Sequence, residues 1–241
     1  MFLDNYLPDS MVNKVPKNPL TITDKQPSLS DIDTKHKELD LSKQPFIKSI
    51  VDGQGNFPKK IDPILKNSFE QLRPLENEAS FSIHTDPNNK VFFQEIAQLG
   101  KEGQTKKNHI PFDNHPLIEV HNHPGEFAHF SGVDLIAFLN STSKAEVVVS
   151  NIGATIMVKT KDSNVSQNPY SANPEISKHE LLSFQISEIQ NTWSAQVKNE
   201  NDAGQRFDFA AKFAQKYNLK ILFVKTGEDK LYDITNMNSQ S

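Results

Sequence analysis

The sequence predicts an α/β fold in which a mixed sheet carries helices on its faces. Segments with the alternating pattern of strands and segments with the spacing of amphipathic helices interleave along the 241 residues. Several strands follow one another across a short turn, such as the Asp-Pro-Asn-Asn turn at 86–89, so hairpins are frequent. Frequent hairpins favour a mixed sheet over a purely parallel, doubly wound one.

The N-terminal segment differs in composition from the rest of the chain. Residues 1–60 are rich in Lys, Asp, Ser, Pro and Asn, and their apolar residues follow no steady period. With 36% hydrophobic and 23% charged residues, the chain is slightly polar for a compact globule, so part of it is expected to bury little surface. We therefore predict a loosely ordered arm over residues 1–60, with a short ordered piece at Phe46 to Val51. Such an arm can dock on the domain or recruit a partner.

The folded domain is predicted over residues 61–241, and its first element is a helix at 62–72. Asp62 can cap this helix, Pro63 suits its first position, and the apolar residues that follow share one face. Strands at about 78–84 and 90–96 then flank the Asp-Pro-Asn-Asn turn.

Both kinds of element continue through the rest of the domain. The predictions are a strand at 117–123 (LIEVHNH), a helix at 132–140, two strands around the Asn-Ile-Gly turn at 151–153, helices near 175–190 and 203–218, and a hairpin around Thr226-Gly227. The domain core is expected at about 61–160, with C-terminal helices and a hairpin at 175–235.

Charge and composition exclude several classes of function. A net charge of −4 and a pI of about 6.1 give no broad electrostatic footprint for nucleic acid or an anionic membrane. The absence of cysteine excludes disulfides, thiolate metal sites and cysteine catalysis. The N-terminus lacks the pattern of a Sec-type signal, and no apolar stretch is long enough to span a membrane. We expect a cytoplasmic protein, with export by a route without such a signal left open.

Two histidines at the end of the third predicted strand point to a metal site. His121 and His123 are two residues apart, so both side chains lie on one face of the strand. Pro124 ends the strand, and the chain returns as a helix whose first turn contains Ser131 and Asp134. Asp134 can then act as a third ligand. Two nitrogens and one carboxylate leave a position for water, which is the open arrangement of catalytic zinc.

The same residues have a purely structural interpretation. Ser131 and Asp134 have the spacing of a capping box, in which a serine caps a helix and an acid three residues later bonds back to the cap. A His-x-His pair on a strand is also common without any metal. The two patterns together are less common by chance than either pattern alone, and their combination favours the metal site.

The stretch from His121 to Asp134, HNHPGEFAHFSGVD, resembles the signature of the JAMM metalloproteases, also called the JAB/MPN family. That signature is His-x-His-Pro, a short loop, then Ser-x-x-Asp, and the resemblance covers about residues 60–160. It implies a cytidine deaminase-like α/β sandwich. It also implies a zinc-dependent peptidase, since many members of the family are isopeptidases that remove ubiquitin or ubiquitin-like modifiers.

The resemblance assigns roles to single residues. It implies that His121, His123 and Asp134 are zinc ligands and that Ser131 helps to stabilise the tetrahedral intermediate. The family also has a glutamate on an earlier strand that moves the proton of the zinc-bound water, and Glu78 matches it best.

The chain departs from the family pattern at two positions. Phe81 stands where a glycine often follows the glutamate, which leaves Glu76 as an alternative to Glu78 for the proton shuttle. Asn122 stands between the histidines, where Ser or Thr is more common, and its side chain is expected to point away from the metal.

The remaining candidate residues are expected to have minor roles. Loop positions are predicted for His109, His115 and His129, the last also considered as an extra metal or substrate contact. Trp193 is predicted to pack against the domain. Glu119 shares the strand face of the metal ligands and is a candidate partner for one imidazole.

The leading hypothesis is a zinc metallopeptidase that hydrolyses a peptide or isopeptide bond by metal-activated water. Its partner would be a protein or peptide substrate, for example a ubiquitin-like conjugate, and not nucleic acid or membrane. The polar segment Gly100 to Pro116 is a candidate substrate-contacting flap. The alternatives are a non-catalytic MPN-like binding or scaffold module and another metallohydrolase, the latter disfavoured by the lack of a basic surface for phosphate.

Overall fold

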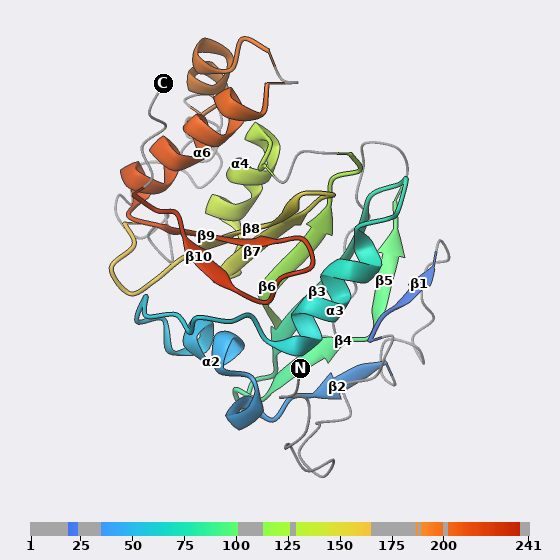
Figure 1. Ribbon diagram of the computed structural model, residues 1–241. Helices are drawn as coiled ribbons and strands as arrows, with labels where there is room; N and C mark the ends of the chain where they lie inside the picture. The colour runs from blue at the N-terminus through green and yellow to red at the C-terminus, as the bar shows by residue number, and fades with distance from the viewer. Residues whose placement is uncertain are drawn as a thin grey trace, which may run out of the picture.

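The structure is a computed structural model that describes residues 19–23, 35–100, 113–125, 129–164, 187, 189–199 and 202–236. These residues form a mixed α/β fold built on one large sheet (Figure 1). The predicted α/β class with a mixed sheet is therefore confirmed. Among the described residues, no helix has both the length and the apolar character needed to cross a membrane.

The described part of the chain contains ten strands. They are β1 (Thr21–Thr23), β2 (His36–Glu38), β3 (Ala79–Thr85), β4 (Val91–Gln94), β5 (Ile96–Leu99), β6 (His115–Asn122), β7 (Ala145–Val149), β8 (Gly153–Val158), β9 (Lys220–Lys225) and β10 (Leu231–Asp233). Their order in the sheet is β1-β5-β3-β6-β7-β8-β9-β10, with β4 beside β3 and β2 beside β4. The β1–β5 and β6–β7 pairs are parallel and the others are antiparallel.

The helices lie on both faces of this sheet. They are a short 3₁₀ helix (Leu41–Lys43), α2 (Pro45–Asp52), α3 (Pro63–Leu72), α4 (Gly132–Asn140), α6 (Ala203–Tyr217) and a helix that includes residues 189–196. Helices α2 and α3 contribute to one hydrophobic cluster, whereas α4, α6 and the 189–196 helix contribute to a second. Strand β7 shows that the sheet separates them, because Val147 and Val149 belong to the first cluster and Val148 to the second.

Most predicted elements agree with the structure within a few residues. The predicted helix at 132–140 is α4, and the predicted hairpin near the C-terminus is β9 and β10. The strand predicted at 90–96 is instead two strands, β4 and β5, which break at Glu95 and pair with different parts of β3. The predicted helix near 175–190 lies almost wholly outside the described residues.

The predicted N-terminal arm is more ordered than its composition suggests. Strand β1 pairs with β5, and β2 pairs with β4. On α2, Phe46, Ile47 and Ile50 are fully buried in the same cluster as α3. The described part of residues 1–60 therefore packs on the sheet and its core, and the ordered piece predicted at Phe46 to Val51 is α2. Strands β1 and β2 are three residues long, which is too short for a clear alternating pattern in the sequence.

The role predicted for Asp62 also needs correction. Asp62 precedes α3, but its side chain makes no capping hydrogen bond to that helix. Its carboxylate instead accepts from the backbone N–H groups of Phe46 (3.0 Å) and Ile47 (2.8 Å), at the start of α2. Asp62 thus joins the two helices, because α2 has no side-chain cap of its own.

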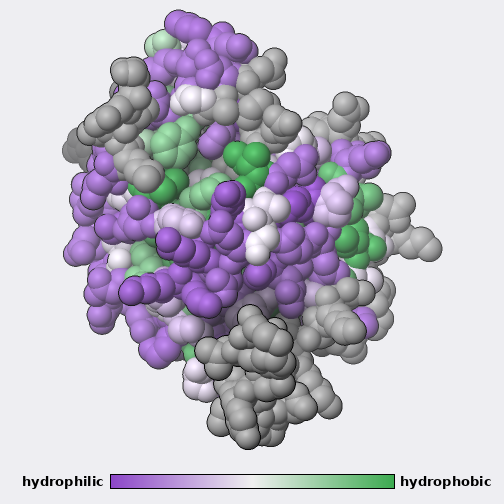
Figure 2. Space-filling model, in the orientation of Figure 1, coloured by the Kyte–Doolittle hydropathy of each residue, from purple (hydrophilic) through white to green (hydrophobic). Residues whose placement is uncertain are grey.

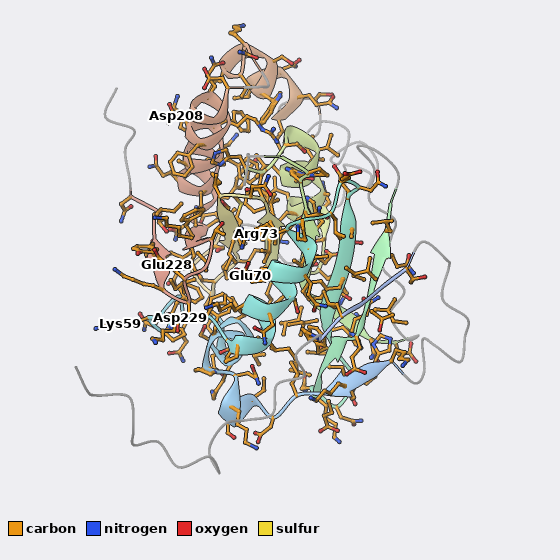
Figure 3. All side chains as sticks on the ribbon, turned by 45° about the vertical axis from the view of Figure 1, so that its right-hand side comes forward. Lys59, Glu70, Arg73, Asp208, Glu228 and Asp229 are labelled. Carbon is orange, nitrogen blue, oxygen red and sulfur yellow. The ribbon has the colours of Figure 1, made fainter. Side chains whose placement is uncertain are left out.

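The end of α3 is tied to two turns of the sheet by Arg73. Its guanidinium donates to the carbonyl oxygen of Ser150 and to the hydroxyl of Thr226, each at 2.5 Å, and forms an ion pair with Glu70. Figure 3 shows Glu70 and Arg73 side by side on α3.

Most of the face shown in Figure 2 is hydrophilic, with smaller hydrophobic patches beside α6. The helix layers therefore leave a largely polar surface over the buried clusters.

Candidate metal centre

The end of β6 and the first turn of α4 bring the three predicted metal ligands together. The Nε2 atoms of His121 and His123 lie 3.2 Å apart. Asp134 Oδ1 lies 3.4 Å from the first of these nitrogens, and Asp134 Oδ2 lies 3.4 Å from the second. One ligand atom from each residue can be chosen so that all lie within 4.8 Å of one another. All three residues are buried or half-buried.

These separations fit the donor set of a small divalent cation. Two ligands at 2.0–2.1 Å from a tetrahedral ion lie about 3.3 Å apart. The observed spacing between the imidazole nitrogens, 3.2 Å, agrees with that value. Two imidazoles and one carboxylate are the nitrogen and oxygen donors that zinc takes in open, catalytic sites. The residues present could therefore hold a metal ion, and their donor atoms are of the kind that zinc takes.

The structural and metal-binding interpretations of Ser131 and Asp134 both apply. The hydroxyl of Ser131 accepts from the backbone N–H of Asp134 (3.2 Å), and Asp134 Oδ2 accepts from the backbone N–H of Ser131 (2.6 Å). This is a complete capping box at the start of α4. The cap holds the Asp134 carboxylate toward the histidines, so capping supports the cluster.

The charges at the site favour a cation between its residues. Burial alone would raise the pKa of Asp134, but the two imidazoles hold that pKa well below its ordinary value. Burial would likewise lower the pKa of His121, but the carboxylates of Asp134, Glu146 and Glu78 together raise it to about 9. The neighbouring carboxylates thus stabilise positive charge where the three residues converge.

Glu146 is a neighbour of the site that sequence reasoning missed. Its Oε1 lies 3.7 Å from Nδ1 of His121, the ring nitrogen that faces away from the cluster. The predicted partner, Glu119, instead accepts a hydrogen bond from the hydroxyl of Ser143. Burial raises the pKa of Glu146 to about 8. Its signal in the sequence was a single acid in the otherwise apolar strand AEVVV.

Glu78 lies next to the same group. It precedes β3, whose register pairs Ser80 with His121, so Glu78 is on the face of the sheet that carries the histidines. Burial raises the pKa of the Glu78 carboxyl, and the charges of His123, His121 and Asp134 act on it. Glu78 is therefore an acid close to the cluster, and its role as proton shuttle stays a prediction.

The other candidate residues lie around the site or away from it. His129 is half-buried, and its ring packs edge-on against Phe207 of α6 at 5.7 Å. The loop position predicted for His115 is wrong, because His115 is the exposed first residue of β6. His109 and most of the predicted flap at 100–116 lie outside the described residues.

Trp193 packs against the domain, as predicted. Its ring stacks edge-on against Phe209 at 4.9 Å and is 9% exposed. It also covers the first residue of α4, since a Cβ atom on Gly132 would lie only 3.1 Å from the indole. Trp193 therefore packs against the start of the helix that carries Asp134.

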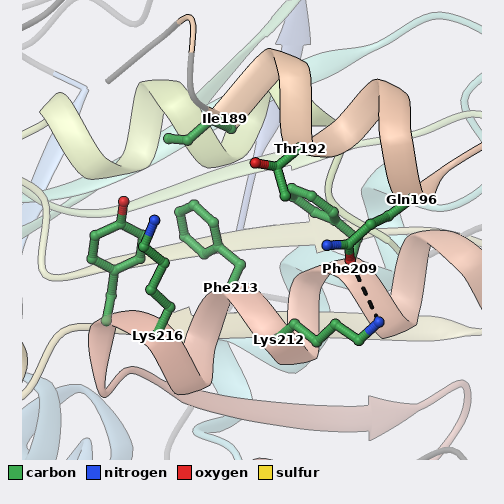
Figure 4. A pocket seen from close by; sticks show the side chains of 8 residues that line it. Ile189, Thr192, Gln196, Phe209, Lys212, Phe213 and Lys216 are labelled. Carbon is green, nitrogen blue, oxygen red and sulfur yellow. Dashed lines mark hydrogen bonds between the residues drawn. The ribbon is translucent and has the colours of Figure 1, made fainter. Parts of the chain in front are cut away.

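A pocket of about 130 Å³ lies between α6 and the 189–196 helix. Apolar side chains such as Ile189 and Phe213 line it, and Lys212 donates to Gln196 at its rim (Figure 4). None of its lining residues belongs to the metal group, so the pocket is separate from the cluster.

Comparison with known proteins assigns no family. No protein-family model, curated protein or solved structure matches the chain.

Proposed function

We propose that this protein is a zinc-dependent metallopeptidase of the JAMM type that hydrolyses a peptide or isopeptide bond. The observation that carries the proposal is the convergence of His121, His123 and Asp134, with the imidazole nitrogens 3.2 Å apart and each 3.4 Å from a carboxylate oxygen. The proposed fold is a JAB/MPN sandwich, and the mixed sheet with helices on both faces is compatible with it.

The chain's own residues supply the remaining parts of the reaction. A zinc ion held by the three ligands would lower the pKa of a coordinated water to about 7 and polarise the scissile carbonyl. Glu78, beside the ligands, would accept the proton of the attacking water and pass it to the leaving amine. The Ser131 hydroxyl accepts from Asp134 N, which leaves its own proton to donate to the developing oxyanion.

Metal analysis of purified protein tests the site. We expect about one zinc per chain, lost in a His123→Ala variant because two ligands hold the ion much less tightly. His115→Ala is the matched control, since His115 is an exposed histidine at the other end of β6 and its loss should leave the zinc content unchanged. Wild-type protein without bound zinc, or equal loss in both variants, would reject the metal site.

A cleavage screen tests the chemistry. Peptides and isopeptide-linked conjugates of ubiquitin-like proteins are incubated with wild-type protein and with Glu78→Gln. We expect cleavage by the wild type only, with zinc bound by both proteins. Cleavage that persists in Glu78→Gln would reject Glu78 as the base, and zinc binding without any cleavage would favour a binding module.

A further inference from the structure

Asn122 lies between the two histidine ligands, but it projects from the opposite face of β6. Its side chain is 1% exposed. Its Oδ1 accepts from the backbone N–H of Ala79 (2.5 Å), and its Nδ2 donates to the carbonyl oxygen of Asn77 (3.3 Å). One buried amide therefore bonds the residues on both sides of Glu78.

The position of these bonds in the sheet explains why a side chain is needed there. The pairing of β3 with β6 ends at Ser80 and His121, so Ala79 has no β6 partner in the ladder, although it still pairs with Leu99 of β5. The side-chain amide of Asn122 hydrogen-bonds Ala79 and Asn77 on this side, where the main chain of β6 no longer supplies partners. On the other side, the carbonyl oxygen of Glu78 accepts from Gly100 N (2.6 Å), at the end of β5.

Three hydrogen bonds thus fix the backbone around Glu78, and two of them come from Asn122. A group that moves a proton works only when its position is held within about 0.5 Å of the productive geometry. Within the described part of the chain, the Asn122 side chain hydrogen-bonds neither the ligand cluster nor the Glu78 carboxylate, so its effect would pass through the backbone.

We propose that Asn122 is a positioning residue, which holds the Glu78 carboxylate over the metal ligands by fixing the peptide groups on both sides of it. The inference rests on the proposed metallopeptidase function, in which Glu78 is the proton shuttle. The side chain of Asn122 points away from the metal site, so its sequence position alone did not suggest this role.

Gln94 provides a matched control for a purely structural role. It is 2% exposed, and its Oε1 accepts from the backbone N–H of Ser82 (3.1 Å) and from the Ser82 hydroxyl (2.9 Å). Like Asn122, it is a buried amide that bonds a main-chain group of β3. Its partner is farther along the strand from Glu78, so Gln94→Ala should weaken the fold without moving Glu78.

The test compares Asn122→Ala with Gln94→Ala in zinc content, thermal stability, kcat and KM for a cleaved substrate, and the pH profile of kcat/KM. We expect Asn122→Ala to keep zinc and KM but to lower kcat by about 10–100-fold and shift the profile, because small displacements of a catalytic group cost this much. Gln94→Ala should keep the wild-type kcat and profile.

A second readout does not depend on cleavage. Cobalt(II) replaces zinc, and its visible spectrum is titrated with pH. We expect Glu78→Gln and Asn122→Ala to shift this titration in the same direction, while Gln94→Ala leaves it unchanged. If Asn122→Ala does not fold, Asn122→Asp carries the same test, because it keeps the acceptor for Ala79 N and loses the donor to Asn77 O.

The two proposals fail differently. A wild-type chain that binds neither zinc nor cobalt overturns the proposed function and this inference with it. A chain that binds metal, but in which Asn122→Ala behaves like Gln94→Ala in the pH profile and the cobalt titration, overturns the positioning role alone.

Discussion

His121 and Glu146 face each other diagonally across the parallel strands β6 and β7, with Nδ1 of the imidazole 3.7 Å from Oε1 of the carboxylate. The opposite ring nitrogen of His121 points to Asp134. A carboxylate behind a metal-binding imidazole orients the ring and raises its basicity. Glu146 is thus placed to support the imidazole of a proposed ligand without itself belonging to the His121-His123-Asp134 group.

Substitution of Glu146 should weaken metal binding. We expect Glu146→Gln to lower zinc affinity by about 10–100-fold, the usual effect of losing an outer partner of a ligand. The measurement is competition with a chromogenic chelator. Glu119→Gln is the control, because Glu119 bonds Ser143 instead of a ligand. Equal affinities in the two variants would show that Glu146 does not support His121.

The two functions of the Ser131–Asp134 pair should separate by mutation. Ser131→Ala removes the cap and should cost about 1 kcal/mol in the free energy of unfolding. It should leave zinc stoichiometry unchanged, because Ser131 is not part of the His121-His123-Asp134 group that could hold the ion. Urea denaturation and metal analysis measure the two effects.

Asp134→Asn should show the converse behaviour. The amide oxygen can still accept from Ser131 N, so the helix stays capped, but the charge that faces both imidazoles is lost. We expect zinc affinity to fall by more than about 100-fold, since the loss of an outer partner alone costs 10–100-fold. A variant that binds zinc as tightly as the wild type would remove Asp134 from the ligand set.

Stability should fall in mild acid because of His84. Burial, together with the neighbouring His36 of β2, lowers the pKa of His84 to about 4, from an ordinary value of 6.5. Between these two pKa values the unfolded chain binds more protons at His84 than the folded chain does. The stability that neutral His84 contributes is therefore fully present above pH 6.5 and is lost as the pH falls toward 4.

The size of this effect follows from the shift, since one pKa unit corresponds to about 1.4 kcal/mol. Between pH 7 and 4.5, the wild type should lose about 2 to 3 kcal/mol more than His84→Leu, which cannot titrate. Urea denaturation in the presence of a chelator measures the difference without a metal contribution. If the wild type and His84→Leu lose the same free energy of unfolding between the two pH values, other groups cause the acid sensitivity.

Removal of the Asp62 carboxylate should destabilise the junction of α2 and α3. Asp62→Ala leaves the buried N–H groups of Phe46 and Ile47 without acceptors, and we expect a loss of about 2 kcal/mol or more. Asp52→Asn is the control, because Asp52 forms an exposed ion pair with Lys48 worth less than about 1 kcal/mol. Chemical denaturation compares them, and equal losses would contradict the proposed link.

Local patterns predicted much of the fold and of the candidate site. The two-residue period of β6 placed His121 and His123 on one face, and the serine–acid spacing predicted the start of α4. Both depend on residues close in the chain, whose geometry is fixed by strand and helix periodicity. The same reasoning failed for Asp62, because the helix ends it could cap are far apart in sequence but adjacent in space.

The sequence by itself determined the class of fold, most elements of the sheet, and the pairing of two imidazoles with a carboxylate. Only the tertiary structure decided that Glu146 lies behind His121, that Asn122 bonds the residues on both sides of Glu78, and that α2 belongs to the core. The reason is physical. A period of two or 3.6 residues acts within one element, whereas these contacts depend on the register between strands and helices that are distant in the chain.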